Sequence, residues 1–430
     1  MIIGMEFRDN GFSNLDFSHI EKGNPGCGGT QYEFALLAHH LLKTMPNAEI
    51  VFFHFNENVF ESGIREIRIS NLQEIPEKAK AACVDILIFW STHNREWYNR
   101  LADCQIKSIA WSHNFLNYQE IQSLYRSALV TQVVSVSREQ YELLRGEDFF
   151  EKCTYIYNMI DFVPDNALPL SNKSNDVCIL GSLIKAKGFH LLAKRWKGIV
   201  KKVPDAKLYV IGGGNLWNKE KKLGSHGLAD QKYEDSFLRY LTDKNGDLLP
   251  SVFFLGNLGK EKDEIIKKCK VGVVNPTGVE TFCLSAVEMQ SLGVPVCTKR
   301  KNGLVNSIIN RHTGLLSLTS IGLANNIVKL LKNDELNYNM GLAGIEFAKS
   351  FSGDLIVYDW IEQIRLANDG LCSCEKKREQ GPYKIKRFRG AIHFLRTKIG
   401  LLFIPSPYQV RLFVSWIEVI GARIKNSVFH

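Results

Sequence analysis

The chain has 430 residues, of which 45% are hydrophobic and 11% aromatic, so it is long enough for two or three domains with buried cores. Its net charge of +9 resides in residues 375–430, which hold twelve Lys/Arg and three Asp/Glu, whereas residues 1–374 carry no net charge. An electroneutral body argues against a nucleic-acid-binding protein, and no apolar run approaches the roughly 20 residues of a membrane-spanning helix.

The cysteines and the first residues bear on cellular location. Ten cysteines are scattered along the chain without a CxxC pair, which predicts a reduced, cytoplasmic environment and no metal site. The opening stretch, MIIGMEFRDN, has no basic segment followed by an apolar one, so no secretory signal is expected.

Short β-branched runs alternate with helical stretches over most of the length, which predicts an α/β protein whose parallel sheets are covered by helices. The expected strands of the first half are 2–7, 49–54, 84–89, 108–111 and 133–136. Those of the second half are 177–182, 208–211, 252–255, 271–275 and 294–298. The polar, proline-containing stretch 158–174 is expected to link the halves, which leaves a cleft where a ligand usually binds.

A glycine-rich loop, 23-GNPGCGGT-30, precedes a helical run, and Thr30 and Glu33 at capping-box spacing mark the expected start of that helix. Such a loop exposes backbone N–H groups to an anion, and the helix dipole adds to the attraction. The loop is neither a Walker A motif nor GxGxxG. A flexible turn without a ligand is therefore an equally good interpretation of the loop by itself.

A second candidate anion site is 177-VCILGSLIKAKGFH-190, where a strand ends near Gly181 and a loop carries Lys185 and Lys187 to a helix after Gly188. A lysine at the carboxyl end of a parallel strand can neutralise a phosphate as a point charge. For an isolated loop of this kind, a solvated surface lysine is the more common case.

The stretch 271-VGVVNPTGVETFCLSAVEMQSLGV-294 predicts a strand at 271–275, a loop, and a helix over 283–292 that Gly293 stops. Glu280 then lies in the loop at the ligand-binding edge, and Glu288 lies more than a turn into the helix. Two carboxylates that face a cleft suit the hydroxyls of a sugar and a ribose. The alternative is a capping box of Ser285 and Glu288, but it leaves a helix of only about seven residues.

Taken together, these stretches resemble the retaining glycosyltransferases of GT-B architecture, specifically family 4. The segment GSLIKAKGFHLL is similar to the family's G-R-x4-K-G motif, and VPDAKLYVIGGG is similar to the strand that follows it. NPTGVETFCLSAVEMQSLGVPV is similar to the E-x7-E signature, and HTGLL to the closing turn. In the first half, GGTQ and SHNF stand where such enzymes carry a glycine-rich loop and an active-site histidine.

The resemblance implies two Rossmann-like domains that face a cleft, with residues 1–165 on the acceptor side and 170–350 binding a nucleotide-sugar donor. Residues 351–374 would form a terminal helix region that returns toward the first domain, followed by a basic extension at 375–430. The implied activity moves a sugar to an acceptor hydroxyl with retention of configuration and without a metal ion or other cofactor. The implied acceptor is a glycan or a lipid-linked molecule in the synthesis of a bacterial polysaccharide or lipopolysaccharide.

Carried over residue by residue, the resemblance implies that Glu280 would hold the donor-sugar hydroxyls and Glu288 the ribose hydroxyls. Lys187 would bind the diphosphate, and His113 would sit beside the transferred sugar, so His113, Glu280 and Lys187 are the candidate catalytic residues. Other donor-binding candidates are Gly28, Gly29, Ser182, Lys185, Thr281, Phe282, Cys283 and Leu284.

Two departures from the family pattern affect this site. Ser182 stands where the family usually has an arginine on the diphosphate, so Lys185 could replace that charge. Thr281 and Cys283 stand where the family has glycines, which predicts a stiffer loop around the donor sugar. The alternatives to a transferase are a nucleotide-sugar epimerase or phosphorylase on the same fold, and a catalytically inactive assembly partner at the membrane. A third is an NAD-binding Rossmann enzyme, against which the lack of GxGxxG after the first strand of either half argues.

The basic extension mixes cationic and apolar residues, as in 376-KKREQGPYKIKRFRGAIHFLRTKIGLLF-403, and 410-VRLFVSWIEVIGARI-424 predicts an amphipathic helix. Each Lys or Arg near an anionic leaflet stabilises the bound state by about 1 kcal/mol. The extension is therefore expected to hold the protein on the inner face of the cell membrane. A solvated extension and a packing surface are the alternatives.

Overall fold

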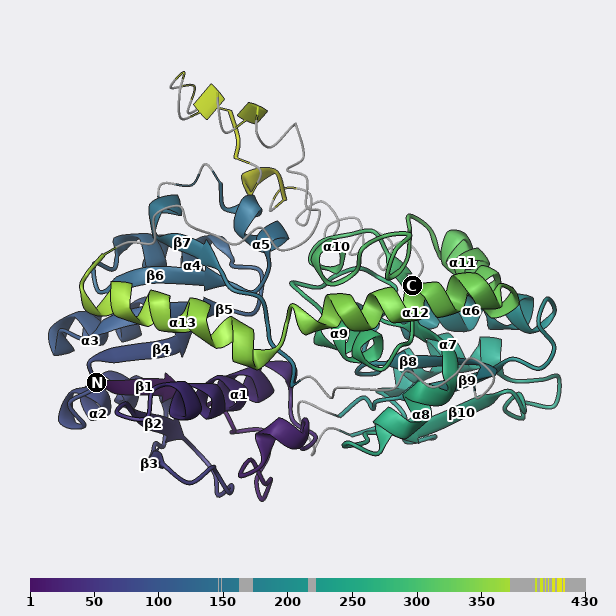
Figure 1. Ribbon diagram of the computed structural model, residues 1–430, viewed down its shortest axis with the longest axis horizontal. Coiled ribbons are helices and arrows are strands. Elements are labelled where there is room, and N and C mark those ends of the chain that lie inside the picture. Colours follow the sequence, from purple (N-terminus) through teal and green to yellow (C-terminus); the bar gives the residue numbers. More distant parts are fainter. Residues whose placement is uncertain are drawn as a thin grey trace.

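The computed structural model folds the chain into two α/β domains that lie side by side, at the left and right of Figure 1. The structure describes residues 1–145, 147, 149–161, 173–215 and 222–371. In the basic extension it describes 391–392, 395–396, 399, 401, 404–406, 408–411 and 413. Most of the expected linker and of the expected helix 410–424 therefore lies outside the described residues.

The first domain is built from an alternation of strands and helices. Its strands are β1 (Ile2–Glu6), β2 (Glu49–His54), β3 (Ile64–Arg68), β4 (Ile86–Trp90), β5 (Lys107–Ser112), β6 (Val130–Ser135) and β7 (Cys153–Tyr155). Its helices are α1 (Gly29–Thr44), α2 (Ile75–Ala81), α3 (Arg95–Cys104), α4 (Tyr118–Arg126), α5 (Arg138–Leu143) and, from the end of the chain, α13 (Gly353–Asn368).

The second domain repeats this alternation. Its strands are β8 (Ser174–Leu180), β9 (Lys207–Ile211), β10 (Val252–Gly256), β11 (Cys269–Val273), β12 (Val296–Lys299) and β13 (Gly314–Ser317). Its helices are α6 (Phe189–Val200), α7 (Gln231–Leu241), α8 (Lys262–Lys268), α9 (Leu284–Ser291), α10 (Leu304–Ser307), α11 (Ser320–Lys332) and α12 (Asp334–Lys349).

Within the described residues each domain has one parallel sheet, with the strand orders β3-β2-β1-β4-β5-β6-β7 and β10-β9-β8-β11-β12-β13. In both sheets the order reverses beside the first strand of the domain, between β1 and β4 and between β8 and β11. Ligands of open parallel sheets bind at such a point, outside the carboxyl ends of the strands. The expected α/β fold with a cleft between two similar halves is confirmed.

The ten strands expected from the sequence are present, with ends that shift by up to three residues. The pattern missed β3 because its residues IREIR lie at the sheet edge and are mostly solvent-accessible. It also missed β7, and it was wrong about HTGLL, whose last residues form the edge strand β13 instead of a turn.

The expected capping box at the start of α1 is wrong. The helix begins at Gly29 with Gly28 as its N-cap, and no side chain caps it. Glu33 is fully buried, and its Oε2 accepts a hydrogen bond of 3.0 Å from the backbone N–H of Met159. The side chain therefore ties α1 to the end of the first domain, and burial raises the pKa of this carboxyl well above its usual range.

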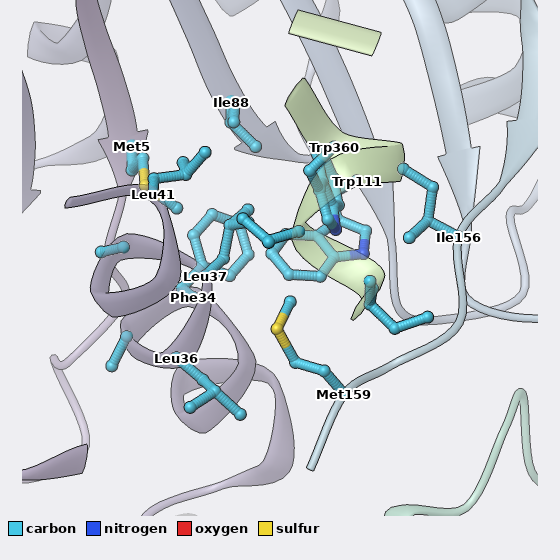
Figure 2. Close-up of a cluster of buried hydrophobic side chains, with 14 of the residues drawn as sticks. Met5, Phe34, Leu36, Leu37, Leu41, Ile88, Trp111, Ile156, Met159 and Trp360 are labelled. Atoms are coloured by element: carbon cyan, nitrogen blue, oxygen red, sulfur yellow. The ribbon is translucent and has the colours of Figure 1, made fainter. Parts of the chain in front are cut away.

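Helix α13 returns from the second domain and completes the core of the first, as Figure 2 shows around Phe34, Trp111 and Trp360. Trp111 of β5 lies with its ring centroid 4.7 Å from that of Phe34 on α1 and 4.4 Å from that of Trp360 on α13. All three side chains are almost completely buried. Aromatic contacts of this kind bury large apolar areas, so α13 belongs to the first domain energetically.

The two chain segments that cross between the domains are hydrogen-bonded to each other. The N–H of Ile160 donates to the carbonyl of Phe351 at 2.9 Å, and the N–H of Gly353 donates to the carbonyl of Ile160 at 3.1 Å. His40 on α1 contacts this crossing, with its Nε2 2.9 Å from Oδ1 of Asp161. A Cβ on Gly353 would lie 2.0 Å from the same Nε2, so this position requires glycine.

Some residues of the basic extension pack against the first domain. Tyr408 is 2% exposed and lies in the apolar cluster that includes Ile121 and Leu124 of α4. The guanidinium of Arg411 lies over the ring of Phe115, and the Ser406 hydroxyl donates to a carboxylate oxygen of Glu147. At these residues the extension packs on the protein. No helix in the described part of the chain is long and apolar enough to cross a membrane.

Candidate functional site

A cavity of about 270 Å³ lies between the two domains at the carboxyl ends of both sheets. The first domain contributes residues of the glycine-rich loop, of α1 and of the loop after β5. The second contributes the loops after β8, β9, β10 and β11. The expected site residues that line the cavity are Gly29, His113, Ser182, Lys187, Glu280, Thr281, Cys283, Leu284 and Glu288.

The glycine-rich loop reaches the second domain. The Asn24 side chain accepts hydrogen bonds from the N–H groups of Gly26 and Cys27 at 2.8 and 2.9 Å, which turns the loop back toward α1. A Cβ on Gly29 would lie 3.2 Å from Cδ1 of Leu284, at the start of α9. The backbone at the start of α1 thus borders the cavity, where its free N–H groups can meet an anion.

Lys187 reaches the cavity from a single 3-10 turn, Lys185–Lys187, which ends at Gly188 with φ of +77°. That turn packs against the next loop, since a Cβ on Gly188 would lie 2.6 Å from a methyl carbon of Thr277. Lys187 forms an ion pair with Glu280. Burial disfavours the charged ammonium, but the Glu280 carboxylate more than offsets this effect and raises the pKa of Lys187.

The loop that carries Glu280 has an unusual backbone. Asn275 has φ of +30°, Gly278 of +76° and Cys283 of +89°, and Cys283 is the N-cap of α9. A side chain in the left-handed region costs about 1–2 kcal/mol, so Cys283 takes a conformation that the family's glycine would adopt without strain. The helix begins at Leu284, so the alternative of a Ser285–Glu288 capping box is wrong, and Glu288 lies more than one turn into α9.

Glu288 has a partner that the sequence analysis missed. Nζ of Lys262, at the start of α8, lies 3.9 Å from Oε1 of Glu288, and the Lys262 side chain is 9% exposed. Lys262 also lines the cavity. The signal was present in 256-GNLGKEKDEI-265, which has the same order of strand end, glycine, lysine and helix as the segment that carries Lys187.

His113 lies at the floor of the cavity on the first domain. It is 9% exposed, and its ring centroid lies 4.5 Å from that of Trp111. Nε2 of His113 has no hydrogen-bond partner among the described residues. Burial lowers the pKa of His113 to about 3, so its imidazole is neutral at physiological pH. A neutral imidazole can donate or accept a hydrogen bond but adds no charge.

Three expected donor-binding residues do not line the cavity. Lys185 is exposed on the outer side of its turn. Phe282 is 1% exposed and packs against Tyr157 and Phe351 in the core between the domains. Gly28 lies behind Gly29 as the N-cap of α1. The structure places Ser182 at the cavity, where it is 4% exposed.

The charged groups of the cavity form two pairs, Lys187 with Glu280 and Lys262 with Glu288. A diphosphate that entered would compete with the carboxylates for the two ammonium groups. The carboxylates would then be free to accept hydrogen bonds from hydroxyl groups. No group of three or more His, Cys, Asp or Glu residues in the described ranges is arranged to hold a metal ion.

Comparison with known proteins agrees with this geometry. Residues 165–347 match the family model described as glycosyl transferases group 1. A D-inositol 3-phosphate glycosyltransferase from Corynebacterium aurimucosum is 27% identical over 189 residues, which cover 43% of this chain and 41% of that protein. The capsular polysaccharide biosynthesis glycosyltransferase CapM from Staphylococcus aureus is 26% identical over 198 residues, 45% of this chain and 47% of CapM. The match thus spans less than half of these relatives.

Solved structures extend the likeness to both domains. A sucrose-phosphate synthase from Thermosynechococcus elongatus superposes with a TM-score of 0.64 and 17% identity, covering 85% of this chain and 98% of its own. HepE of Anabaena, in complex with UDP-glucose, gives a TM-score of 0.62 and 15% identity over 85% of this chain and 99% of its own. The second domain is therefore similar to the glycosyl transferases group 1, and the chain as a whole has the two-domain GT-B architecture.

Proposed function

We propose that the protein transfers a sugar from a nucleotide-sugar to an acceptor hydroxyl with retention of anomeric configuration. The observation that carries this proposal is the pair of ammonium–carboxylate contacts, Lys187 with Glu280 and Lys262 with Glu288, in one cavity between the domains. A nucleotide diphosphate supplies the anion for the ammonium groups. A sugar and a ribose supply the hydroxyls for the carboxylates.

In the proposed reaction the diphosphate replaces Glu280 as the ion-pair partner of Lys187. The Glu280 carboxylate then accepts hydrogen bonds from the hydroxyls of the donor sugar. The bond between the anomeric carbon and the diphosphate oxygen breaks while the acceptor oxygen bonds to that carbon on the same face. The acceptor proton passes to the departing phosphate oxygen. Lys187 and the backbone N–H groups at the start of α1 stabilise the charge that develops on the leaving group, and such stabilisation is usually the largest contribution to catalysis.

His113 has a positioning task in this scheme. Its neutral ring lies beside the place where the sugar would sit, and its Nε2 is unpaired among the described residues. A buried polar atom without a partner favours a ligand that supplies a hydrogen bond. We propose that a hydroxyl of the transferred sugar is this hydrogen-bond partner.

The comparisons support a finer proposal on substrates. HepE binds UDP-glucose, and CapM acts in capsular polysaccharide biosynthesis. We propose a nucleoside-diphosphate sugar as donor and a glycan or lipid-linked acceptor in the synthesis of a bacterial surface polysaccharide or lipopolysaccharide. No metal ion or other cofactor is assigned to the reaction.

A cytoplasmic protein held on the inner face of the membrane by residues 375–430 would suit a lipid-linked acceptor. Truncation is a poor test, because Tyr408 is buried in the first domain and its loss would disturb that core. The better test keeps the full chain and changes Lys384, Lys386, Arg387 and Arg389 to glutamine. Unchanged binding to anionic vesicles would rule out a role of these cations.

The reaction is tested first through donor binding. A thermal-shift screen of UDP, GDP, ADP, CDP and their common sugars compares the wild type with Glu288→Gln. A ligand at 100 times its Kd stabilises the folded protein by about 2.7 kcal/mol. We expect one nucleotide to stabilise the wild type and the substitution to remove most of that effect.

The control is Glu346→Gln, which changes an exposed carboxylate on α12 that is not part of the cavity lining. It should bind the nucleotide like the wild type. If no nucleotide stabilises either protein, the donor site is refuted. If Glu288→Gln binds unchanged, the ribose role of Glu288 is refuted. A radiolabelled sugar appearing on an acceptor, instead of free epimer or sugar phosphate, then distinguishes transfer from epimerase or phosphorylase chemistry.

A further inference from the structure

Two segments of the second domain contain cations but no Asp or Glu. Residues 177–204 hold seven Lys/Arg, and residues 289–333 hold six. Because residues 1–374 carry no net charge, carboxylates elsewhere in the body balance these cations. The charge of the body is therefore distributed asymmetrically, and the second domain has a basic side.

The two segments come together on one face of the second domain. Helices α6 and α11 pack against each other, and Figure 1 shows them close together at the right end of the molecule. The Arg195 guanidinium lies 3.4 Å from Oγ of Ser320, and Nζ of Lys202 donates to Oδ1 of Asn325 at 3.3 Å. These contacts link α6 and the turn after it to α11, so the cations of both segments share a surface.

The cations of this surface, which we call the α6–α11 face, are solvent-accessible and lack carboxylate partners among the described residues. They are Arg195, Lys201, Lys202, Arg300, Lys301, Lys329 and Lys332. Lys194 and Lys197 face α7 instead, where Lys194 contacts the Tyr240 ring and Lys197 donates to the Thr242 carbonyl. Acidic residues resume on the chain at Asp205 and Asp334. Like charges crowded on one face repel each other, and a polyanionic surface would relieve that repulsion.

Two exposed apolar side chains stand among these cations at the start of α11. Leu318 is 78% exposed and Ile321 is 56% exposed. The N–H of Arg300 donates to the carbonyl of Ser317 at 2.8 Å, which places Arg300 next to Leu318. The Arg195 contact with Ser320 places a second guanidinium next to Ile321. Aliphatic side chains flanked by guanidinium groups match the boundary between lipid headgroups and acyl chains.

We propose that the α6–α11 face docks on an anionic lipid surface, with Leu318 and Ile321 inserted between headgroups. The exposed aliphatic side chains favour a lipid surface over a nucleic acid, whose recognition uses aromatic stacking and phosphate contacts. The proposal goes beyond the transferase function, because none of these residues belongs to the cavity or to residues 375–430. It places the carboxyl edge of β12 and β13, next to the Glu280 loop, close to the membrane.

The test is sedimentation of the full-length protein with phosphatidylcholine vesicles that contain or lack phosphatidylglycerol. Each Lys or Arg near an anionic leaflet contributes about fivefold to the partition coefficient, so Arg300→Gln/Lys301→Gln should lower it by about 25-fold. Leu318→Ser/Ile321→Ser keeps every charge and should also weaken binding. The matched control is Lys80→Gln/Lys244→Gln, two exposed cations outside the face.

The outcomes separate this proposal from its alternatives. Absence of wild-type binding to phosphatidylglycerol vesicles refutes it, as does equal weakening by the control pair. Loss of binding only in the variant of Lys384, Lys386, Arg387 and Arg389 assigns the membrane contact to the basic extension and also refutes it. If Leu318→Ser/Ile321→Ser binds vesicles unchanged and polyuridylate competes with them, the face is a general polyanion site. These readouts need no nucleotide or activity, so they are independent of the transferase proposal.

Discussion

The hydroxyl of Thr281 donates a hydrogen bond of 2.7 Å to the main-chain carbonyl of His113. The bond crosses from the loop that carries Glu280 to the loop after β5, and so connects the two domains beside the cavity. A threonine at this position, where the family pattern has glycine, therefore adds a hydrogen bond between the two domains.

Replacement of Thr281 tests that connection. Thr281→Val keeps the shape of the side chain but removes the hydroxyl, which should cost about 1 kcal/mol and weaken nucleotide binding about fivefold. Thr281→Ser should retain the bond and the affinity. Calorimetric titration with the nucleotide found in the screen measures both. Equal affinities of wild type and Thr281→Val would show that the bond does not support the binding-competent arrangement.

Replacement of the two lysines of the 3-10 turn should have different effects on nucleotide affinity. Lys187→Met removes the ammonium group that faces Glu280, so affinity for a nucleoside diphosphate should fall by about 10- to 100-fold, while affinity for the nucleoside changes little. Lys185→Met should bind both like the wild type, because Lys185 is exposed outside the cavity lining. A larger loss in Lys185→Met than in Lys187→Met would instead favour the compensation for Ser182 considered from the sequence.

His113 predicts a pH dependence of stability. Burial lowers its pKa to about 3 from the usual 6.5, so below pH 6.5 the unfolded chain binds a proton that the folded chain does not. The free energy of unfolding should then fall as the pH falls, with a contribution that approaches 1.4 kcal/mol per pH unit near about pH 5. Denaturant titrations of the wild type and His113→Gln measure the difference. Parallel pH curves for the two proteins would contradict this prediction.

The crossing between the domains depends on the absence of a side chain at residue 353. Gly353→Ala would place a methyl group 2.0 Å from Nε2 of His40, and such overpacking should destabilise the protein by about 1–3 kcal/mol. In a His40→Ala background the same change should cost much less. Chemical denaturation of the four proteins in this double-mutant cycle gives the coupling. If the glycine substitution costs the same in both backgrounds, the contact with His40 is not its cause.

The sequence predicted the two sheets well because buried parallel strands read as short apolar runs between helices. It failed for β3, whose polar residues lie at an edge. The return of residues 351–374 toward the first domain was expected from the family resemblance, but the contacts of α13 in the core around Trp111 were not predicted. Those contacts join residues about 250 positions apart, such as Trp111 with Trp360, and no local pattern records them.

In the candidate site, too, local sequence patterns predicted some features, whereas others depend on contacts between distant parts of the chain. The loops with Lys187 and Glu280 were predictable because they follow strands at the carboxyl edge, and the structure brings both residues to one cavity with His113 and Glu288. The predicted capping role of Glu33 was wrong, because capping-box spacing cannot distinguish a surface cap from a buried carboxyl. Thr281 was predicted as a donor-binding residue and as a departure from glycine. Its hydrogen bond to His113 could not be predicted, because that bond depends on the relative position of the two domains.

The positions of Trp360 and Tyr408 also affect how the protein is made. Residues 173–349, which build the second sheet and its helices, form a continuous segment of the chain. The first domain cannot close its core until α13 and then Tyr408 have left the ribosome. Although translation normally favours the N-terminal domain, here the later half can finish folding first. The apolar surface around Phe34 and Trp111 therefore stays uncovered until α13 has been made.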